Sequence, residues 1–428
     1  MKSMTQEHRN FEENSIIRED ERLATLALSI PVQVPHTAFT EVCIGILCEA
    51  LRAGAGAFSR EQFLDAESKL GSQIQVSGDS KNIHIALSSL DTALASTLTL
   101  LELMLMKPTF AQNELKRIKE LLTNSLILSK EDARTRAYEG FVNALVNPED
   151  KRYMFSIDTL IQHIKKVTVK DLKKFHATLW NSKWIATVGG KNASAQKIVR
   201  SIKKLHDTHS THENAHNDIV PFRDRIKRTV VTLDIPHKQN IEFSIGNTLL
   251  LKRSDDAYPA FVFGMSVLAL YGGFSGRLMS TVREKEGLTY SIYGQAEKVT
   301  KTEYGFWRIA TFFSPKDAKK GIEATLREIM LILEKGITEN ELKRFKAIMN
   351  TRSALVNDSL LKKVREVQGL RENDISDSEY EAFKSKIQKM TSKEVGTALQ
   401  KYLNLNTLVI SAAGPIQSIK KQIETFAK

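Results

Sequence analysis

The sequence predicts an α+β fold with two homologous domains, each a sandwich of helices packed on a mainly antiparallel sheet. Two observations support this prediction. Several segments of the first half recur in the same order in the second half, and strand patterns are interleaved with pairs of amphipathic helices in both halves. We therefore expect an internal duplication, with domains at residues 1–203 and 229–428 and a polar linker at 204–228.

The clearest repeat is the run Asn-Glu-Leu-Lys-Arg, followed by an apolar residue and Lys, which stands at 113–119 and again at 340–346. A long pattern of apolar residues three and four apart precedes each copy, at 90–106 and at 316–333. This spacing is typical of an amphipathic helix that buries one face. Each half is therefore predicted to contain a pair of long helices at the same place.

Each half also ends on a helix that leads into a strand. Thr168 and Thr391 stand before acidic first turns, where a Thr side chain accepts a hydrogen bond from the backbone and caps the helix. The strands that follow are expected at 184–188 and 407–411.

Earlier strands are expected in both halves. One strand is predicted at 23–34, followed by a hairpin at 74–87 that turns at Gly78-Asp79, and a strand at 306–313 takes the same part in the second half. His84 alternates with the apolar residues of the hairpin, so we expect it on the opposite face, in solvent.

The segment 204–228 is polar and has no helix or strand period. It carries four histidines at three- and four-residue spacing, namely His206, His209, His212 and His216. Such a run can hold a metal ion adventitiously. A hydrated tether between the two domains is the favoured interpretation.

Composition excludes several classes of protein. The 428 residues are 42 % apolar and 26 % charged, which is ordinary for a globular chain and excludes a disordered or collagen-like one. No apolar run is long enough to span a membrane, so no transmembrane helix is predicted. Only Cys43 and Cys48 occur, too few for a disulfide framework.

The formal net charge of +12 favours acidic partners. A nucleic-acid binder is not expected, because basic runs interleaved with aromatic residues are missing. The segment 1–8 has no apolar stretch and acidic residues follow it soon after, which argues against a secretory signal or an Arg-rich transit peptide. We therefore expect a cytoplasmic chain, with an already processed organellar chain as the alternative.

The most informative segment is Tyr-Gly-Gly-Phe-Ser-Gly-Arg-Leu at 271–278, followed by Val-Arg-Glu-Lys-Glu-Gly-Leu-Thr-Tyr at 282–290. A phosphate-binding loop is excluded, because no strand precedes the glycines and the Gly-Lys-Ser/Thr ending is missing. The residues 271–276 are instead expected to end an apolar helix that contains Phe261 and Leu268.

These two segments resemble the M16 family of metallopeptidases, whose members carry a Gly-Gly-Phe-Ser-x-Arg-Leu turn and then Arg-Glu-Lys-x-Gly-Leu-x-Tyr. The resemblance extends from about residue 24 to about residue 415. It implies paired M16-type domains that face each other across a chamber. One domain binds zinc through His-x-x-Glu-His and a later Glu, and the other supplies an Arg and a Tyr close to the scissile bond.

The residues that match this Arg and Tyr are Arg283 and Tyr290. By resemblance, they are the expected catalytic residues of the chain. An Arg can hold a substrate carbonyl or carboxylate, and a Tyr hydroxyl can stabilise an oxyanion. Taken alone, the two would be read as an Arg in a helix salt bridge and a Tyr at the start of a strand.

The zinc motif of the family is degenerate here. Aligned on the Gly and Ser that follow it, Gly45 stands at the first ligand, Cys48 at the general base and Glu49 at the second ligand, and Ser125 stands at or beside the third ligand. Glycine has no side chain to offer a metal, and neighbouring positions on a helix point about 100° apart. We expect no metal site in this chain and Cys48 packed as a small buried residue.

The resemblance thus implies a non-zinc subunit of a heterodimeric M16 peptidase, inactive alone, whose partner of similar size carries His-x-x-Glu-His and the zinc. The complex would cleave an extended peptide or a precursor peptide, bound as an added strand at a sheet edge. The alternative is a catalytically inert structural subunit of a larger assembly. A separate enzyme class is not expected, because the histidines form no nucleophile and base pattern.

Overall fold

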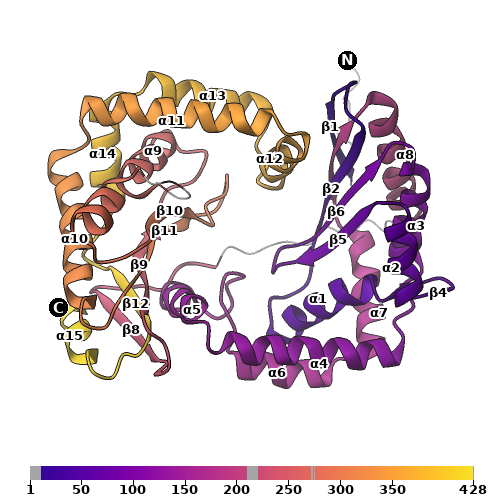
Figure 1. Cartoon of the computed structure of the whole chain (residues 1–428), viewed down its shortest axis with the longest axis horizontal. Helices are drawn as coiled ribbons and strands as arrows, with labels where there is room; N and C mark the ends of the chain where they lie inside the picture. The colour runs from indigo at the N-terminus through magenta and orange to yellow at the C-terminus, as the bar shows by residue number, and fades with distance from the viewer. Residues whose placement is uncertain (1–10, 210–219, 271–272, 274, 428) are drawn as a thin grey trace, which may run out of the picture. The chain divides into compact units, whose positions relative to one another are not determined.

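The computed structural model describes residues 11–209, 220–270, 273 and 275–427. These residues form two five-stranded sheets, each with helices packed on it (Figure 1). In order across the first sheet, the strands are β1 (Phe11–Ile17), β7 (Trp184–Gly190), β2 (Leu23–Pro31), β6 (Asn82–Leu90) and β5 (Gln73–Gly78). In order across the second, they are β8 (Thr229–Asp234), β12 (Val409–Gly414), β9 (Ile241–Leu249), β11 (Gly305–Phe313) and β10 (Ile292–Glu297).

The two sheets have the same construction. In the first, β1 pairs with β7 in parallel and the other neighbours are antiparallel. In the second, β8 pairs with β12 in parallel and the other neighbours are antiparallel. The predicted fold class, two duplicated α/β sandwiches with mainly antiparallel sheets, is therefore confirmed.

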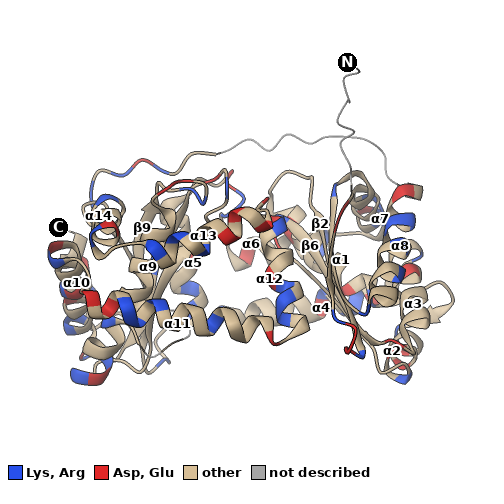
Figure 2. Cartoon of the chain, turned by 90° about the horizontal axis from the view of Figure 1, so that it is seen from above, with Lys and Arg blue, Asp and Glu red and all other residues tan. Residues whose placement is uncertain are grey.

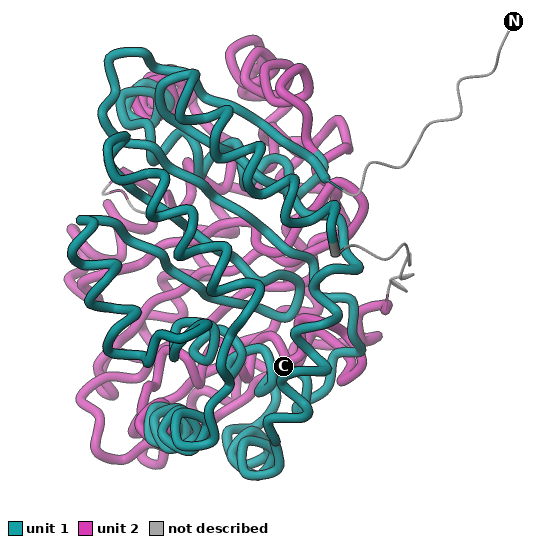
Figure 3. Tube along the Cα trace, turned by 90° about the vertical axis from the view of Figure 1, so that its right-hand side faces the viewer, with its two compact units in different colours: residues 1–127, 155–218, 353–374 teal, residues 128–154, 219–352, 375–428 magenta. Residues whose placement is uncertain are grey.

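The chain divides into two compact units, which are coloured separately in Figure 3. Unit 1 consists of residues 1–127, 155–218 and 353–374, and unit 2 consists of residues 128–154, 219–352 and 375–428. These units differ from the domains expected at 1–203 and 229–428, because each takes one segment from the other half of the sequence.

The exchanged segments are the helices α5 (Ala133–Leu145) and α12 (Leu360–Glu372). Helix α5 comes from the first half and packs on β12, β9 and β8 of unit 2, whereas α12 comes from the second half and packs on β7, β2 and β1 of unit 1. Each sheet therefore has its own helices on one face and a helix from the other half of the sequence on the other. Sequence periodicity cannot reveal this exchange, since it shows that a helix has an apolar face but not which sheet this face packs on.

The remaining helices belong, apart from a few end residues, to the unit formed by their own half of the sequence. Those of unit 1 are α1 (Ala38–Leu51), α2 (Arg60–Lys69), α3 (Leu94–Met106), α4 (Gln112–Ser129), α6 (Ile157–Lys166), α7 (Val169–Thr178) and α8 (Asn192–His209), with a two-residue hairpin, β3 (Gly54–Ala55) and β4 (Phe58–Ser59), after α1. Those of unit 2 are α9 (Tyr258–Ala269), α10 (Ala318–Lys335), α11 (Glu339–Asn357), α13 (Asp377–Lys389), α14 (Ser392–Tyr402) and α15 (Lys420–Glu424). The last residues of α4 and of α11 lie beyond the unit boundaries.

Local signals in the sequence locate several helix ends. Thr168 caps α7 and Thr391 caps α14, each accepting a hydrogen bond from the backbone of the third helical residue. Both predicted caps are confirmed. The helix expected at 90–106 is shorter than predicted, because β6 continues through Leu90 and α3 starts at Leu94.

Two expectations near the ends of unit 1 are wrong. The sequence predicts one strand before α1, but β1 precedes β2 and pairs with β7. His206, expected in a hydrated tether, lies in α8 and is 1 % exposed, with its ring against Phe11 and Trp184. The rest of the predicted linker includes 210–219, which lie outside the described residues.

Charge is spread over the helices. Figure 2 shows basic and acidic residues interspersed along α8 and α10. Within the described ranges, no helix combines the length and the apolar character that crossing a bilayer requires.

Candidate functional site

Arg283 and Tyr290 lie side by side in unit 2. Arg283 is in a turn of π-helix, Met279–Lys285, and Tyr290 stands two residues before β10. The chain reverses between them at Gly287, whose φ of +64° is in the left-handed region that favours glycine. The Leu288 N–H donates to the carbonyl oxygen of Val282 at 3.0 Å and closes the turn.

The pair has a defined geometry. The Arg283 guanidinium lies over the Tyr290 ring, 4.6 Å from its centre, and one of its nitrogens is 3.6 Å from the sulfur of Met279. A cation over an aromatic face is attracted by the ring quadrupole. Tyr290 is nevertheless 72 % exposed, so its hydroxyl group can reach a bound molecule. π-Helical turns are rare and occur frequently at functional sites.

A half-buried ion pair fixes the segment in front of Arg283 and Tyr290. Arg277 makes a bidentate contact with Glu341 at the start of α11, with distances of 2.6 and 2.7 Å, and also donates to the carbonyl oxygen of Gly336. The glycine turn expected at 271–276 is partly outside the described residues, since 271, 272 and 274 are not described. Arg277 belongs to the described part of this motif, and it ties the π-helical turn to α11.

The positions aligned with zinc ligands lie in unit 1, on α1 and α4. Gly45, Cys48 and Glu49 stand on α1 and Ser125 stands on α4. A Cβ atom added at Gly45 would have Leu122 of α4 as its nearest neighbour, at 3.9 Å. The two helices therefore run beside each other at this point, as the alignment requires, but the side chains there are not those of a metal site.

The donor chemistry of these residues does not fit zinc. Gly45 has no donor atom, and Glu49 and Ser125 are exposed. Cys48 is buried, as the sequence predicts, and its burial, with the charge of Glu49, raises the pKa of its thiol to about 12. A cysteine binds zinc as a thiolate, and this raised pKa keeps Cys48 protonated at neutral pH. Among the described residues, no group of three or more His, Cys, Asp or Glu side chains is placed to hold a metal.

His84 is only 32 % exposed and has polar partners on both ring nitrogens, contrary to the prediction that it lies in solvent. Its Nδ1 lies 3.0 Å from the Ser29 hydroxyl and 3.4 Å from a Glu372 oxygen, and its Nε2 lies 3.6 Å from Asp79. Hydrogen bonds to Asp79 and Glu372 raise the pKa of His84 to about 9, although burial opposes them. The face expected to be in solvent is covered by α12, which carries Glu372.

This cluster is unsuited to acid–base catalysis. A cavity of about 240 Å³ lies beside it, but Ser29 is 1 % exposed and donates to Glu372. A His that is protonated at neutral pH cannot accept a proton from the serine. The cluster instead ties α12 to the sheet of unit 1.

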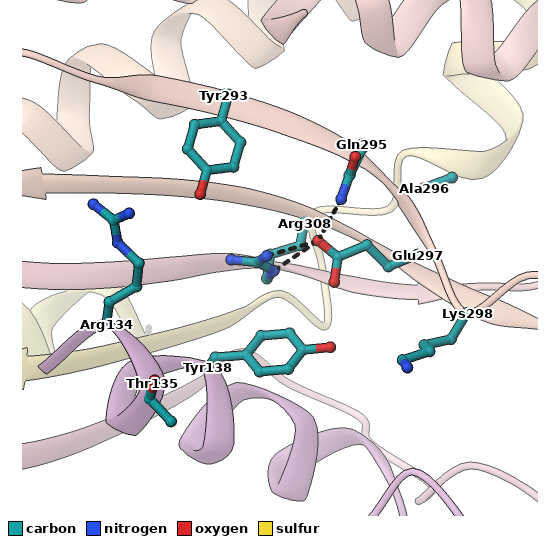
Figure 4. A pocket seen from close by; sticks show the side chains of 9 residues that line it. All are labelled: Arg134, Thr135, Tyr138, Tyr293, Gln295, Ala296, Glu297, Lys298 and Arg308. Atoms are coloured by element: carbon teal, nitrogen blue, oxygen red, sulfur yellow. Dashed lines mark hydrogen bonds and ion pairs between the residues drawn. The ribbon is translucent and has the colours of Figure 1, made fainter. Parts of the chain in front are cut away.

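Another polar cavity lies in unit 2, and no pattern in the sequence predicts it. It has a volume of about 490 Å³ and lies between α5 and the strands β10 and β11 (Figure 4). Arg308 of β11 lies between Glu297, at 2.7 Å, and the ring of Tyr138, at 4.6 Å from its centre. No sequence signal brings Tyr138 and Arg308 together, because they belong to different halves of the chain.

Comparisons with known proteins agree with this fold. Residues 166–349 match the family model described as the peptidase M16 inactive domain. A protein of Helicobacter pylori named non-peptidase homolog YmxG is 21 % identical over 373 residues, which are 86 % of this chain and 83 % of that protein.

Solved structures show the same architecture. A peptidase M16 inactive domain from Pseudomonas fluorescens superposes with a TM-score of 0.79 at 20 % identity, covering 95 % of each chain. A protease from Helicobacter pylori superposes with a TM-score of 0.80 at 12 % identity, covering 95 % of this chain and 97 % of that one. The chain is thus similar to the peptidase M16 inactive domain over residues 166–349, and these structures share its fold over almost its whole length.

Proposed function

We propose that this chain is the subunit without zinc of a heterodimeric M16-type peptidase, and that it has no peptidase activity alone. The observation that carries the proposal is the contrast between the Arg283–Tyr290 pair, which is present, and the aligned zinc positions, which lack suitable donors. The guanidinium of Arg283 lies 4.6 Å from the ring centre of Tyr290, whereas Gly45, Glu49 and Ser125 cannot form a zinc site. A relative named a non-peptidase homolog, similar over 86 % of this chain, supports the absence of activity in the chain alone.

A partner chain of similar size, with an intact His-x-x-Glu-His motif and its zinc ion, would activate the water that attacks the peptide bond. This chain would supply the groups that hold the peptide. Arg283 presents several N–H donors to substrate carbonyl oxygens, and the hydroxyl of Tyr290 donates a hydrogen bond to the oxygen on which negative charge develops. Peptides or precursor peptides in extended form are the proposed substrates.

A second candidate function is that of a catalytically inert structural subunit in a larger assembly. The relative named a non-peptidase homolog favours it. The two candidates differ in one point: a structural subunit has no use for an exposed Tyr290 beside Arg283. The cytoplasmic location stays a prediction from the sequence, and cell fractionation tests it.

The test begins with native mass spectrometry and zinc analysis of the complex isolated from the chain's own source. A one-to-one complex with a chain of similar mass and one zinc ion supports the peptidase subunit. A zinc-free homodimer, or a place in a large assembly, supports the structural subunit.

The second step is Tyr290→Phe in the reconstituted complex. Turnover of a peptide is expected to fall by roughly ten- to a thousandfold, as it does when an oxyanion donor is removed. Tyr304→Phe is the matched control, since Tyr304 is also exposed (40 %) and lies outside the motif. Unchanged turnover in the Tyr290 variant would contradict the role proposed for it.

A further inference from the structure

The cavity between α5 and the strands β10 and β11 lies apart from the residues of the M16 motif. Its lining comes entirely from unit 2: Arg134, Thr135 and Tyr138 of α5, Tyr293, Gln295, Ala296 and Glu297 of β10, Lys298 and Arg308 (Figure 4). Eight of these nine side chains carry a polar group, and the cavity is therefore suited to a polar ligand rather than to an apolar one.

Positive charge exceeds negative charge in this lining. Three of the side chains are cationic and one, Glu297, is a carboxylate. Glu297 is already used, because two nitrogens of Arg308 donate to it at 2.7 and 3.0 Å. Lys298 is exposed, and Arg134, whose Nε is paired with Glu242, still presents its terminal nitrogens to the cavity.

Arg134 is only partly held by the protein. Its Nε donates to Glu242 at 3.3 Å, and burial raises the pKa of this carboxyl. The Arg134 side chain is 57 % exposed, and Figure 4 shows its guanidinium directed from α5 towards the strand of Tyr293. The terminal nitrogens of a guanidinium form a fork that matches a carboxylate.

Lys298 lies at the end of the cavity opposite Arg134 (Figure 4). Its φ of +56° lies in the left-handed region, which residues other than glycine seldom adopt. Tyr138, on the wall between, is a hydrogen-bond donor at neutral pH, because burial raises the pKa of its hydroxyl. Cations thus stand at both ends of the cavity and hydroxyl donors stand between them.

We propose that this cavity binds a carboxylate of an acidic peptide, either an Asp or Glu side chain or the free carboxyl end of the chain. That the peptide is also a substrate rests on the proposed function. Binding itself is a property of this chain. Residues Tyr293, Gln295 and Glu297 alternate along β10 on the cavity side, so the polar lining of the cavity follows the direction of an extended strand.

The test measures binding of short peptides to the isolated full chain by titration calorimetry at low salt. The probes are a decapeptide rich in Asp and Glu, its Asn and Gln counterpart, and both peptides with an amidated end. The acidic peptide is expected to bind more tightly than the neutral amidated one, and more weakly as salt is added. Loss of binding on amidation assigns the site to the chain end, and its retention assigns the site to the side chains.

The variants are Arg134→Gln and Lys298→Gln, each expected to weaken binding of the acidic peptide about tenfold. Lys343→Gln, at an exposed position of α11 outside the cavity, removes the same charge and is expected to leave binding unchanged. Lys298 is exposed, so its variant keeps the test valid if Arg134→Gln unfolds. Equal affinity for acidic and neutral peptides, or an equal loss in the Lys343 variant, would overturn the proposal.

The isolated chain separates this result from that of the proposed function. If the peptides bind and the reconstituted complex does not turn over, the cavity is a peptide site and the peptidase proposal fails. If the complex turns over and Lys298→Gln binds the acidic peptide like the unchanged chain, the cavity proposal fails by itself.

Discussion

His84 shows how one residue joins a strand to a helix from the other half of the chain. It stands on β6 opposite Ser29 of β2, and Glu372 of α12 faces it from the covering helix. Asp79, in the turn before β6, faces its other nitrogen. Burial acts against the charge of Asp79, yet hydrogen bonds from His84 and from the backbone lower the pKa of Asp79 to about 2. The cluster is thus a cation held between two carboxylates.

This charge arrangement gives a pH dependence. The pKa of His84 is about 9 in the folded chain, against about 6.5 for an unperturbed His, so the folded chain holds one more proton between these values. Its contribution to stability is fully present below about pH 6.5 and is lost as the pH rises through 9. Arg365, which also lines the adjoining cavity, is a further charge near this cluster.

We expect His84→Gln to lower the free energy of unfolding by about 1 to 2 kcal/mol at pH 6, a value reduced for the partial exposure of the ring. The difference from the unchanged chain is expected to vanish at pH 10. Urea unfolding at the two pH values measures it. Ser77→Ala, which alters the same cavity without a titrating group, should show no such trend. A difference that is the same at both pH values would contradict a charged His84.

At the scale of elements, the duplication is visible in contacts as well as in sequence. The Glu of the repeated Asn-Glu-Leu-Lys-Arg run is Glu114 in the first copy and Glu341 in the second. Glu114 lies 3.7 Å from Arg60, which follows the β3–β4 hairpin, and Glu341 binds Arg277 after the glycine turn. Each copy therefore ties the start of a long helix to an Arg that follows a glycine-rich segment.

The exchanged helix α12 approaches its sheet closely, and glycine makes this possible. A Cβ atom at Gly189 of β7 would lie 2.7 Å from Val364 and 2.8 Å from Leu360, both buried side chains of α12. Carbon atoms this close repel strongly, so α12 or its side chains must move. A larger residue at 189 would therefore loosen α12 from the sheet.

We expect Gly189→Ala to lower the free energy of unfolding by about 1 to 3 kcal/mol, as overpacking of a core does. Gly369→Ala is the matched control on α12 itself. A Cβ there meets no atom within 4 Å, and Ala favours a helix over Gly by about 1 kcal/mol, so this variant should be more stable. Denaturant unfolding of both variants measures whether the free energy of unfolding falls in the Gly189 variant and rises in the Gly369 variant. A stabilised Gly189 variant would show that α12 does not pack as described.

At the scale of the whole molecule, neither half of the sequence contains a complete unit. The second half lacks α5, whose residues Phe141 and Leu145 pack with Phe306 of β11 in a core of their own. The first half lacks α12, which carries Leu360 and Val364. Expressed alone, each half would expose an apolar sheet face that its missing helix covers.

We therefore expect the fragments 1–209 and 220–428 to be poorly stable alone and to copurify in a one-to-one complex when they are expressed together. An affinity tag on the first fragment, followed by size exclusion, measures this. Adding residues 353–374 to the first fragment is expected to improve its stability, because these residues supply its missing helix. Two monomeric fragments that unfold cooperatively by themselves would contradict the exchange.

The sequence alone determined what depends on local spacing. Apolar periods predicted the two long helices of each half, Thr168 and Thr391 marked the starts of α7 and α14, and Gly45 offers zinc no donor atom at the aligned position. The segment from Arg283 to Tyr290 resembles an M16 motif, and this resemblance predicts a joint role for the two residues.

Only the tertiary structure decided which helix covers which sheet. The exchange of α5 and α12, the cluster around His84 and the cavity beside Tyr138 all join residues from different halves of the chain. Periodicity fixes which face of a helix is apolar, but the partner of that face is chosen by the packing of the whole chain. His84 was predicted in solvent for this reason: its strand pattern shows a second face, and only the fold shows that α12 covers it.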